Sequence, residues 1–443
     1  MTLMKSLLLG SAAAFAVAGA AQASDLLPTK KSAPAQYVKI CTIDGMTGFT
    51  LPGSDTCLKI SGHVHVELGP VGYSDQWSQT ALGFAKNVAN TRNSFGWFTR
   101  ARIQFDARSA TAYGTLRSFA SLDFKHTSDN AIAGANGDGT GIDKAFIQWA
   151  GLTVGRAQSF YDFYAGDYED AGGSDITVST LAYTASFGGG MSATLALENN
   201  RDRLVEGFAW NNNGAVLTTL SGRSNQVPDV IGVFRVDQGW GSAQLSAALH
   251  NVNVTEGATG TGANYSHTGF AVQGGVKFNV PSMGAGDAFW LQAAYANGAL
   301  SYIGVGSGPQ DILGNGFNHT DGDLVTEGAG AVVQIPTGFS VLGAFEHHFG
   351  PTFWLAPYIG YLNVSYSNHY ASSLQTNWNQ IIAGVDTHWD PVTNLDFNLL
   401  LRYSHLNQGT PGGGVVPVPI VGGGTFKNNT DTFFVRLNIE RDF

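Results

Sequence analysis

Residues 58–68 read Leu-Lys-Ile-Ser-Gly-His-Val-His-Val-Glu-Leu. Every even position in this stretch is apolar or glycine, and every odd position is polar. A period of two predicts a β-strand with one apolar and one polar face. The same alternation returns in residues 97–108 and in residues 431–443. The sequence therefore predicts an all-β protein.

Three further features favour a membrane barrel over a soluble sandwich. Many alternating segments run 11–14 residues, about twice the length of a usual strand. Their polar faces are rich in arginine, and their apolar faces end in Trp, Tyr or Phe, as the aromatic girdles of an outer-membrane barrel require. Short turns and long loops also alternate along the chain, which is the rhythm of periplasmic turns and extracellular loops.

Sixteen strands are predicted from this pattern. Residues 325–335 could form a seventeenth, but that strand would invert every later short turn to the outside, so we expect a loop there. An even number of antiparallel strands closes the sheet and places residues 58–68 beside residues 431–443. A sixteen-stranded barrel is wide enough to leave an aqueous channel. The predicted strands are 58–68, 95–109, 114–126, 142–150, 152–157, 179–187, 190–199, 229–236, 241–251, 267–279, 287–297, 338–349, 353–366, 377–389, 395–407 and 431–443.

The composition agrees with a large exported barrel. The chain has 443 residues, of which only 13% are charged and 58 are glycine. A formal net charge of −10 without a basic run argues against nucleic-acid binding.

The N-terminus predicts export. Residues 1–23 have Lys5 near their start, then an apolar run, and they close on Ala-Gln-Ala, which is typical of a cleaved signal peptide. No run of 18 apolar residues follows, so a helical membrane span is not expected. Residues 24–57 form a predicted periplasmic-side segment before the barrel at 58–443. In an exported protein, the even pair Cys41 and Cys57 predicts a disulfide.

Four segments resemble those of rhizobial-type alphaproteobacterial porins, namely residues 37–41, 53–62, 145–160 and 441–443. The resemblance implies a sixteen-stranded, homotrimeric general-diffusion porin in the outer membrane of a Gram-negative bacterium, in contact with lipid and lipopolysaccharide. It implies that the third long loop folds into the lumen, and that Phe443 is the assembly signal. Arg441 departs from the family pattern, which has an apolar or aromatic residue two positions before the end.

The third long loop, residues 158–178, carries acids and no Lys or Arg, whereas the neighbouring wall strands carry arginines. If the loop lies inside the barrel, its acids and the wall arginines flank a narrow water-filled gap. Such a gap selects solutes by their size and ions by the electric field between the opposed charges. Alternatively, the acids solvate an outward loop and the arginines coat a wide lumen. We expect Arg156 to lie nearest the loop. The predicted constriction residues are Arg100, Arg102, Arg117, Arg156, Asp162, Asp167, Glu169 and Asp170.

No enzyme or cofactor motif stands out. The patterns GxSxG, HExxH, GxGxxG and the P-loop are absent from the sequence. The adjacent His347 and His348 point to opposite faces of a strand, so no metal site is expected there, and no cofactor is expected. The leading hypothesis is passive diffusion of ions and small hydrophilic solutes. The alternatives are an outer-membrane barrel enzyme and a secreted β-sandwich adhesin.

Overall fold

The structure of the protein is a computed structural model. It describes residues 39–70, 73–74, 77–80, 83–86, 95–128, 137–163, 172–205, 208–210, 216–222, 227–256, 262–305, 321–327, 332–366, 377–409 and 429–443.

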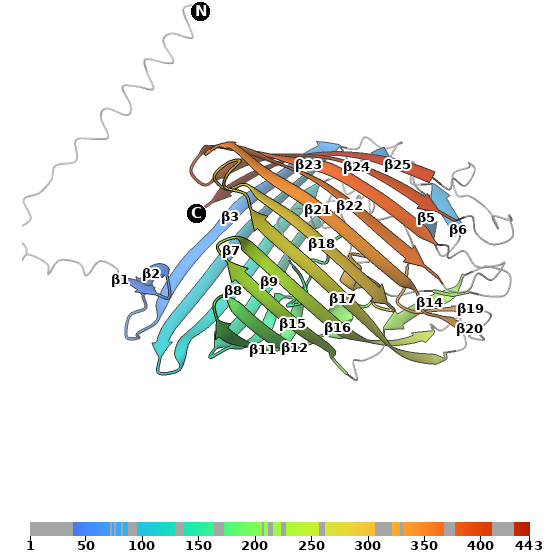
Figure 1. Cartoon of the computed structure of the whole chain (residues 1–443), viewed down its shortest axis with the longest axis horizontal. Coiled ribbons are helices and arrows are strands. Elements are labelled where there is room, and N and C mark those ends of the chain that lie inside the picture. Colours follow the sequence, from blue (N-terminus) through green and yellow to red (C-terminus); the bar gives the residue numbers. More distant parts are fainter. Residues whose placement is uncertain are drawn as a thin grey trace, which may run out of the picture.

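Sixteen antiparallel strands form a closed barrel, as predicted (Figure 1). Each strand pairs with the next along the wall, and β25 closes the sheet by pairing with β3 from Leu437↔Leu68 to Asp442↔His63. The wall strands are β3 Cys57–Pro70, β7 Phe95–Thr111, β8 Gly114–Ser128, β9 Gly137–Trp149, β10 Leu152–Gln158, β11 Thr177–Gly188, β12 Met191–Glu198, β15 Asp229–Gln238, β16 Gly241–Glu256, β17 Asn264–Asn279, β18 Ala288–Asn297, β21 Thr337–Gly350, β22 Phe353–Ser365, β23 Trp378–Val392, β24 Leu395–Gln408 and β25 Asn429–Asp442.

The remaining elements belong to the connections and the N-terminus. Residues 325–335 hold the short strands β19 (Val325–Glu327) and β20 (Val332–Gln334). These strands pair with each other, and β19 also pairs with β13 (Phe208–Trp210), but among the described residues neither pairs with a strand of the barrel wall, so the prediction of a loop there is confirmed. In the described part of the chain, no helix is long and apolar enough to cross a membrane. These elements are β1 Ile40–Ile43, β2 Met46–Thr50, β4 Tyr73–Ser74, β5 Trp77–Thr80, β6 Gly83–Lys86, β13 Phe208–Trp210, β14 Val216–Gly222, β19 Val325–Glu327, β20 Val332–Gln334 and the 3₁₀ segments η3 Asn200–Asp202 and η4 Leu300–Ile303.

The wall has an apolar outer face and a polar inner face because side chains alternate along each strand. Large apolar side chains such as Leu195, Leu245 and Ile359 are exposed on the outside. Near the short turns, Trp149 and Trp240 are also exposed, as an aromatic girdle at the membrane interface requires. Buried polar and charged side chains make up the inner face.

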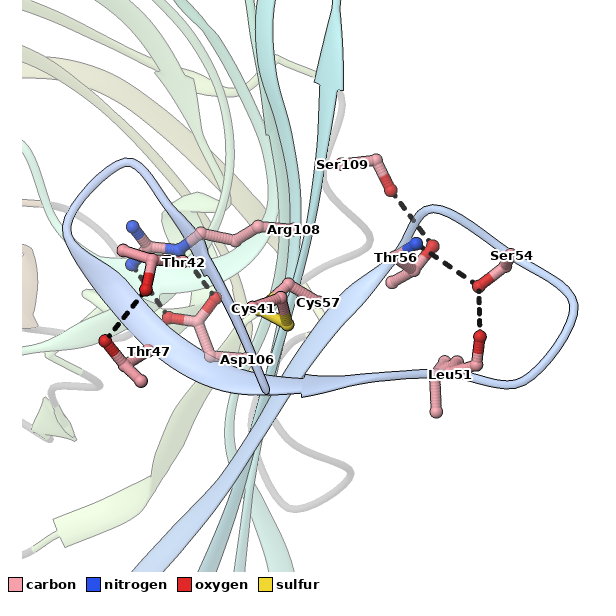
Figure 2. Close-up of a disulfide and its surroundings, with 10 residues drawn as sticks. All are labelled: Cys41, Thr42, Thr47, Leu51, Ser54, Thr56, Cys57, Asp106, Arg108 and Ser109. Carbon is pink, nitrogen blue, oxygen red and sulfur yellow. Dashed lines mark hydrogen bonds and ion pairs between the residues drawn. A yellow bond between two sulfur atoms is a disulfide. The ribbon is translucent and has the colours of Figure 1, made fainter. Parts of the chain in front are cut away.

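A small hairpin precedes the barrel at the end that carries the short turns (Figure 1). Strands β1 and β2 turn at Asp44-Gly45, and both residues have positive φ angles of 49° and 74°, which a tight two-residue hairpin turn requires. Cys41 and Cys57 form the predicted disulfide, which ties β1 to the start of β3 (Figure 2). The Arg108 guanidinium also donates to the Asp44 carbonyl oxygen at 2.8 Å. The hairpin is therefore fixed to the barrel at β1 and at its turn.

Candidate functional site

The inner face of the first strands carries a dense set of charges. Strand register places His63 opposite Arg102 and His65 opposite Arg100 on the inward side of β3 and β7. Arg102 binds Asp123 through Nε–Oδ1 and Nη2–Oδ2 contacts of 2.6 and 2.9 Å. Its Nη2 also lies 3.2 Å from Asp143 Oδ1. Arg100 and Arg102 thus face the lumen, and much of the Arg102 charge is balanced by carboxylates.

Arg117 lies closer to the short turn between β7 and β8. Its side chain binds Asp106, with Nη2–Oδ2 at 2.9 Å, and donates to Gln148 Oε1 at 3.0 Å. Arg108 shares the same Asp106 carboxylate. Arg117 therefore faces the lumen at the end of the barrel near the short turns. The Asp106 carboxylate binds both its guanidinium group and that of Arg108.

The prediction that Arg156 faces the constriction is wrong. Strand pairing places Arg156 opposite Ser179, in the same row as the exposed outer residues Val154 and Leu181. Its Nη1 atom lies 3.9 Å from Asp202 Oδ2. The period of two along residues 152–156, Leu-Thr-Val-Gly-Arg, places Arg156 on the outer face of the strand. Arg156 is next to the loop in the sequence, but its side chain does not face the lumen.

Loop 158–178 begins by packing on the inner wall. The Gln244 amide of β16 donates to the carbonyl oxygens of Phe160, Tyr161 and Asp162 at 3.1–3.3 Å. The Gln273 amide of β17 donates to the Tyr161 carbonyl at 3.0 Å. These bonds join the loop to strands four and five places further along the wall from β10.

The other described parts of the loop also lie against the wall. An added Cβ at Gly275 of β17 would lie 2.3 Å from the Phe163 ring, so glycine is required for this close approach. At the returning end, a Cβ on Gly172 would lie 3.7 Å from the side chains of Ser340 and Leu362, on β21 and β22. Both described ends of the loop therefore rest against inward-facing residues of the barrel.

The acids of the loop do not all have the predicted role. Asp162 is fully buried, and its Oδ1 atom accepts hydrogen bonds from Ser174 Oγ at 2.6 Å and Arg203 Nη2 at 2.8 Å. It anchors the loop, so the prediction that it lines the constriction is wrong. Burial first, and then the charge of Asp162, raise the pKa of Asp175. The predicted constriction residues Asp167, Glu169 and Asp170 lie outside the described residues.

Arg203 lies at the centre of the contacts that hold the loop, and it was not predicted from the sequence. Its side chain is fully buried, its Nη1 donates to Ser174 Oγ at 2.8 Å, and its Nε lies 3.8 Å from Glu198 Oε2. Glu198 also accepts hydrogen bonds from Ser159 Oγ and Phe160 N at 2.7 and 3.0 Å. We call Asp162, Ser174, Glu198 and Arg203 the loop anchor.

Electrostatics keep Arg203 charged. Burial alone would lower the pKa of the Arg203 guanidinium, but the neighbouring Asp162 carboxylate raises it above its usual value. The Tyr302 ring lies under the guanidinium, with 4.2 Å between Arg203 Cζ and the ring centroid, a cation–π geometry.

A second inward segment supports the first. Tyr302, in η4, packs edge-on against Tyr161 with 4.7 Å between ring centroids. Its hydroxyl donates to Asp229 Oδ2 at 2.6 Å. Asp229 and Asp323 flank the buried His250, with His250 nitrogens 2.7 and 3.3 Å from the two carboxylates. The described ends of loop 158–178 and the described residues of the long connection between β18 and β21 thus pack together on one side of the inner wall.

Comparison with known proteins agrees with this architecture. A family model described as "Porin subfamily" matches residues 25–418. The chain is 31% identical over 333 residues to Porin Omp2b of Brucella suis, covering 66% of this chain and 84% of that protein. It is 30% identical over 328 residues to Porin Omp2b of Brucella melitensis, with the same coverage.

A solved structure has the same fold at low sequence identity. The outer membrane channel DcaP of Acinetobacter baumannii matches with a TM-score of 0.62 and 14% identity, covering 89% of this chain and 99% of that one. The chain belongs to the porin family and is a channel protein of the Gram-negative outer membrane.

Proposed function

We propose that the barrel is a water-filled channel for passive diffusion of ions and small hydrophilic solutes, narrowed by loop 158–178. The observation that carries the proposal is the attachment of both described ends of this loop to the inner wall, through Gln244 and Gln273 at one end and beside Gly172 at the other. A loop held there occupies lumen cross-section. The charged wall beside it favours water over apolar solutes.

The charge arrangement belongs to the same proposal. Asp167, Glu169 and Asp170 are proposed to oppose the lumen arginines, of which Arg100 and Arg102 lie further from the short turn than Arg117. Fixed charges within about 10 Å of each other are only partly screened at 0.1 M salt. The field across the gap would then select among ions as well as by size.

Planar bilayers test the channel directly. We expect purified protein to insert and give stepwise, ohmic currents, and to make liposomes permeable to small sugars. Protein that shifts on an SDS gel when heated, and is therefore a folded barrel, but carries no current would refute the proposal. An enzyme in the barrel is not proposed, because both ring nitrogens of His65 and of His250 lie beside carboxylates, which leaves neither ring a nitrogen for activating a hydroxyl or thiol nucleophile.

A homotrimer is also proposed, and Arg156 supports it. Strand β10 has 7 residues and β12 has 8, fewer than the ~9–11 that span a bilayer. Arg156 stands four positions beyond Leu152, about 9 Å above the girdle for a strand tilted ~45°. An arginine facing lipid near mid-height costs roughly 2–4 kcal/mol. Contact with a neighbouring subunit would remove this cost.

Reversing the outer charge should separate the subunits. In Arg156→Glu, the outer face carries two neighbouring carboxylates of the same subunit, at positions 156 and 202. Covering two unpaired negative charges at a subunit contact is costly, so we expect a shift from trimer to monomer in mild detergent, measured by light scattering. The heat-dependent gel shift should persist because the barrel wall is untouched. A monodisperse monomer for the wild-type protein would contradict the trimer.

The N-terminal residues, the outer surface of the barrel and the C-terminal residue also have proposed roles. Residues 1–23 are proposed to be removed on export, and residues 24–57 to stay on the periplasmic side with the β1–β2 hairpin. Lipid is proposed to contact the apolar outer wall, and lipopolysaccharide its extracellular rim. Phe443, whose amide donates to the Gly62 carbonyl at 2.9 Å, is proposed as the assembly signal.

A further inference from the structure

The first and last strands of the barrel bring a histidine and two carboxylates together on the inner face. In the pairing of β25 with β3, Asp442 lies opposite His63 and Glu440 opposite His65. His63 Nδ1 is 3.5 Å from Glu440 Oε1 and 4.0 Å from Asp442 Oδ1. The three ligand atoms lie within 4.8 Å of one another. We call His63, Glu440 and Asp442 the seam triad.

The spacing of the seam triad suits a metal ion better than a hydrogen bond. Tetrahedral Zn²⁺ holds nitrogen and oxygen ligands at ~2.0–2.2 Å, which places the ligand atoms about 3.4 Å apart. The distances of 3.5 and 4.0 Å from His63 Nδ1 are close to this value and too long for a hydrogen bond. His63 is also largely buried.

Neighbouring side chains orient the ligands. His65 Nδ1 is 2.8 Å from Glu440 Oε2, and His65 Nε2 is 3.0 Å from the buried Glu67 Oε1. These two contacts fix Oε2 of Glu440 and leave its Oε1 facing His63. Carboxylates that bind metals are commonly held by hydrogen bonds of this kind.

The nearest cations also permit a bound ion. Arg102 lies opposite His63, and its guanidinium is bound by Asp123 and Asp143. Arg100 lies opposite His65. The three carboxylates of Glu67, Glu440 and Asp442 carry more negative charge than Arg100 alone can balance.

We propose that the seam triad binds a divalent transition-metal ion, best matched by Zn²⁺, with a fourth position open to lumen water. Three protein ligands and one open position are an established zinc arrangement. The ion would join the two strands that close the barrel. No metal site was expected from the sequence, because His63 lies in the first strand of the barrel and Glu440 in the last, so the two residues form no local motif.

Titration calorimetry with ZnCl₂ on the EDTA-treated full-length protein tests the proposal. We expect one Zn²⁺ per chain, loss of binding in His63→Ala, and binding weakened by roughly 10–100-fold in His65→Gln, which removes only an outer partner. The matched control is His405→Ala, which removes a His–Asp pair on β24 and β25 with 2.7 Å between His405 Nδ1 and Asp431 Oδ1. It should bind Zn²⁺ like the wild type.

Two results would overturn the site: no Zn²⁺ binding by the wild type, or wild-type affinity in His63→Ala. Because His63 is largely buried, Asp442→Asn serves as a second variant at a side chain that is 59% exposed. It should retain the heat-dependent gel shift and bind Zn²⁺ more weakly. Zn²⁺ should also raise the temperature of that gel shift in the wild type and not in His63→Ala, and an equal rise in both would count against the site.

Discussion

Replacing Arg203 with methionine is expected to release loop 158–178 from the barrel wall while the barrel remains closed. The variant leaves the buried carboxylates of Asp162 and Glu198 without their cation. Removing one partner of a buried ion pair costs roughly 3–5 kcal/mol. The sixteen-stranded wall keeps its own hydrogen bonds, so the loss should fall on the loop. Limited proteolysis of folded protein should show new cleavage within residues 158–178.

A compensating variant separates charge from packing. Adding Asp162→Asn and Glu198→Gln to Arg203→Met removes the uncompensated charges, so protection of the loop should largely return. Replacing all members of a buried charge cluster with neutral groups is often nearly neutral in stability. Equal protease resistance of Arg203→Met and the wild type would show that the loop anchor does not hold the loop.

Replacing residues 164–171 with a short Gly-Ser linker is expected to widen the channel. The change removes Asp167, Glu169 and Asp170 and keeps both anchored ends of the loop. Larger sugars should then enter, as measured by liposome swelling. Gly275→Val, which drives a side chain into Phe163, should act in the same direction. Gly274→Val is its matched control, because an added Cβ there meets nothing within 4 Å.

The wall of the barrel could be predicted from the sequence because strand alternation is local. Each predicted strand overlaps an observed one, and the rejection of residues 325–335 rested on turn parity alone. Strand β9 begins at Gly137, five residues before the predicted start at 142. The segment Gly-Asp-Gly-Thr-Gly at 137–141 has no apolar alternation, so its extended conformation follows from pairing with β8.

The interior could be predicted only in part, because its contacts are not local. Arg100 and Arg102 lie on the inner face that the alternation indicated. Asp162 is bound by Arg203, 41 positions later in a different loop, and nothing in the sequence signals that contact. Arg156 is a different case, since its outer position follows from the same period of two that placed the strands. Proximity to the loop along the sequence therefore does not determine which face of the strand a side chain occupies.

If loop 158–178 narrows a water-filled lumen, shortening the loop must raise the ion current. Single-channel conductance of the 164–171 linker variant, measured beside the wild type in the same lipid bilayer and salt solution, shows this. We expect a conductance well above that of the wild type, with the heat-dependent gel shift intact. An unchanged conductance in a folded linker variant would place the loop outside the conducting path.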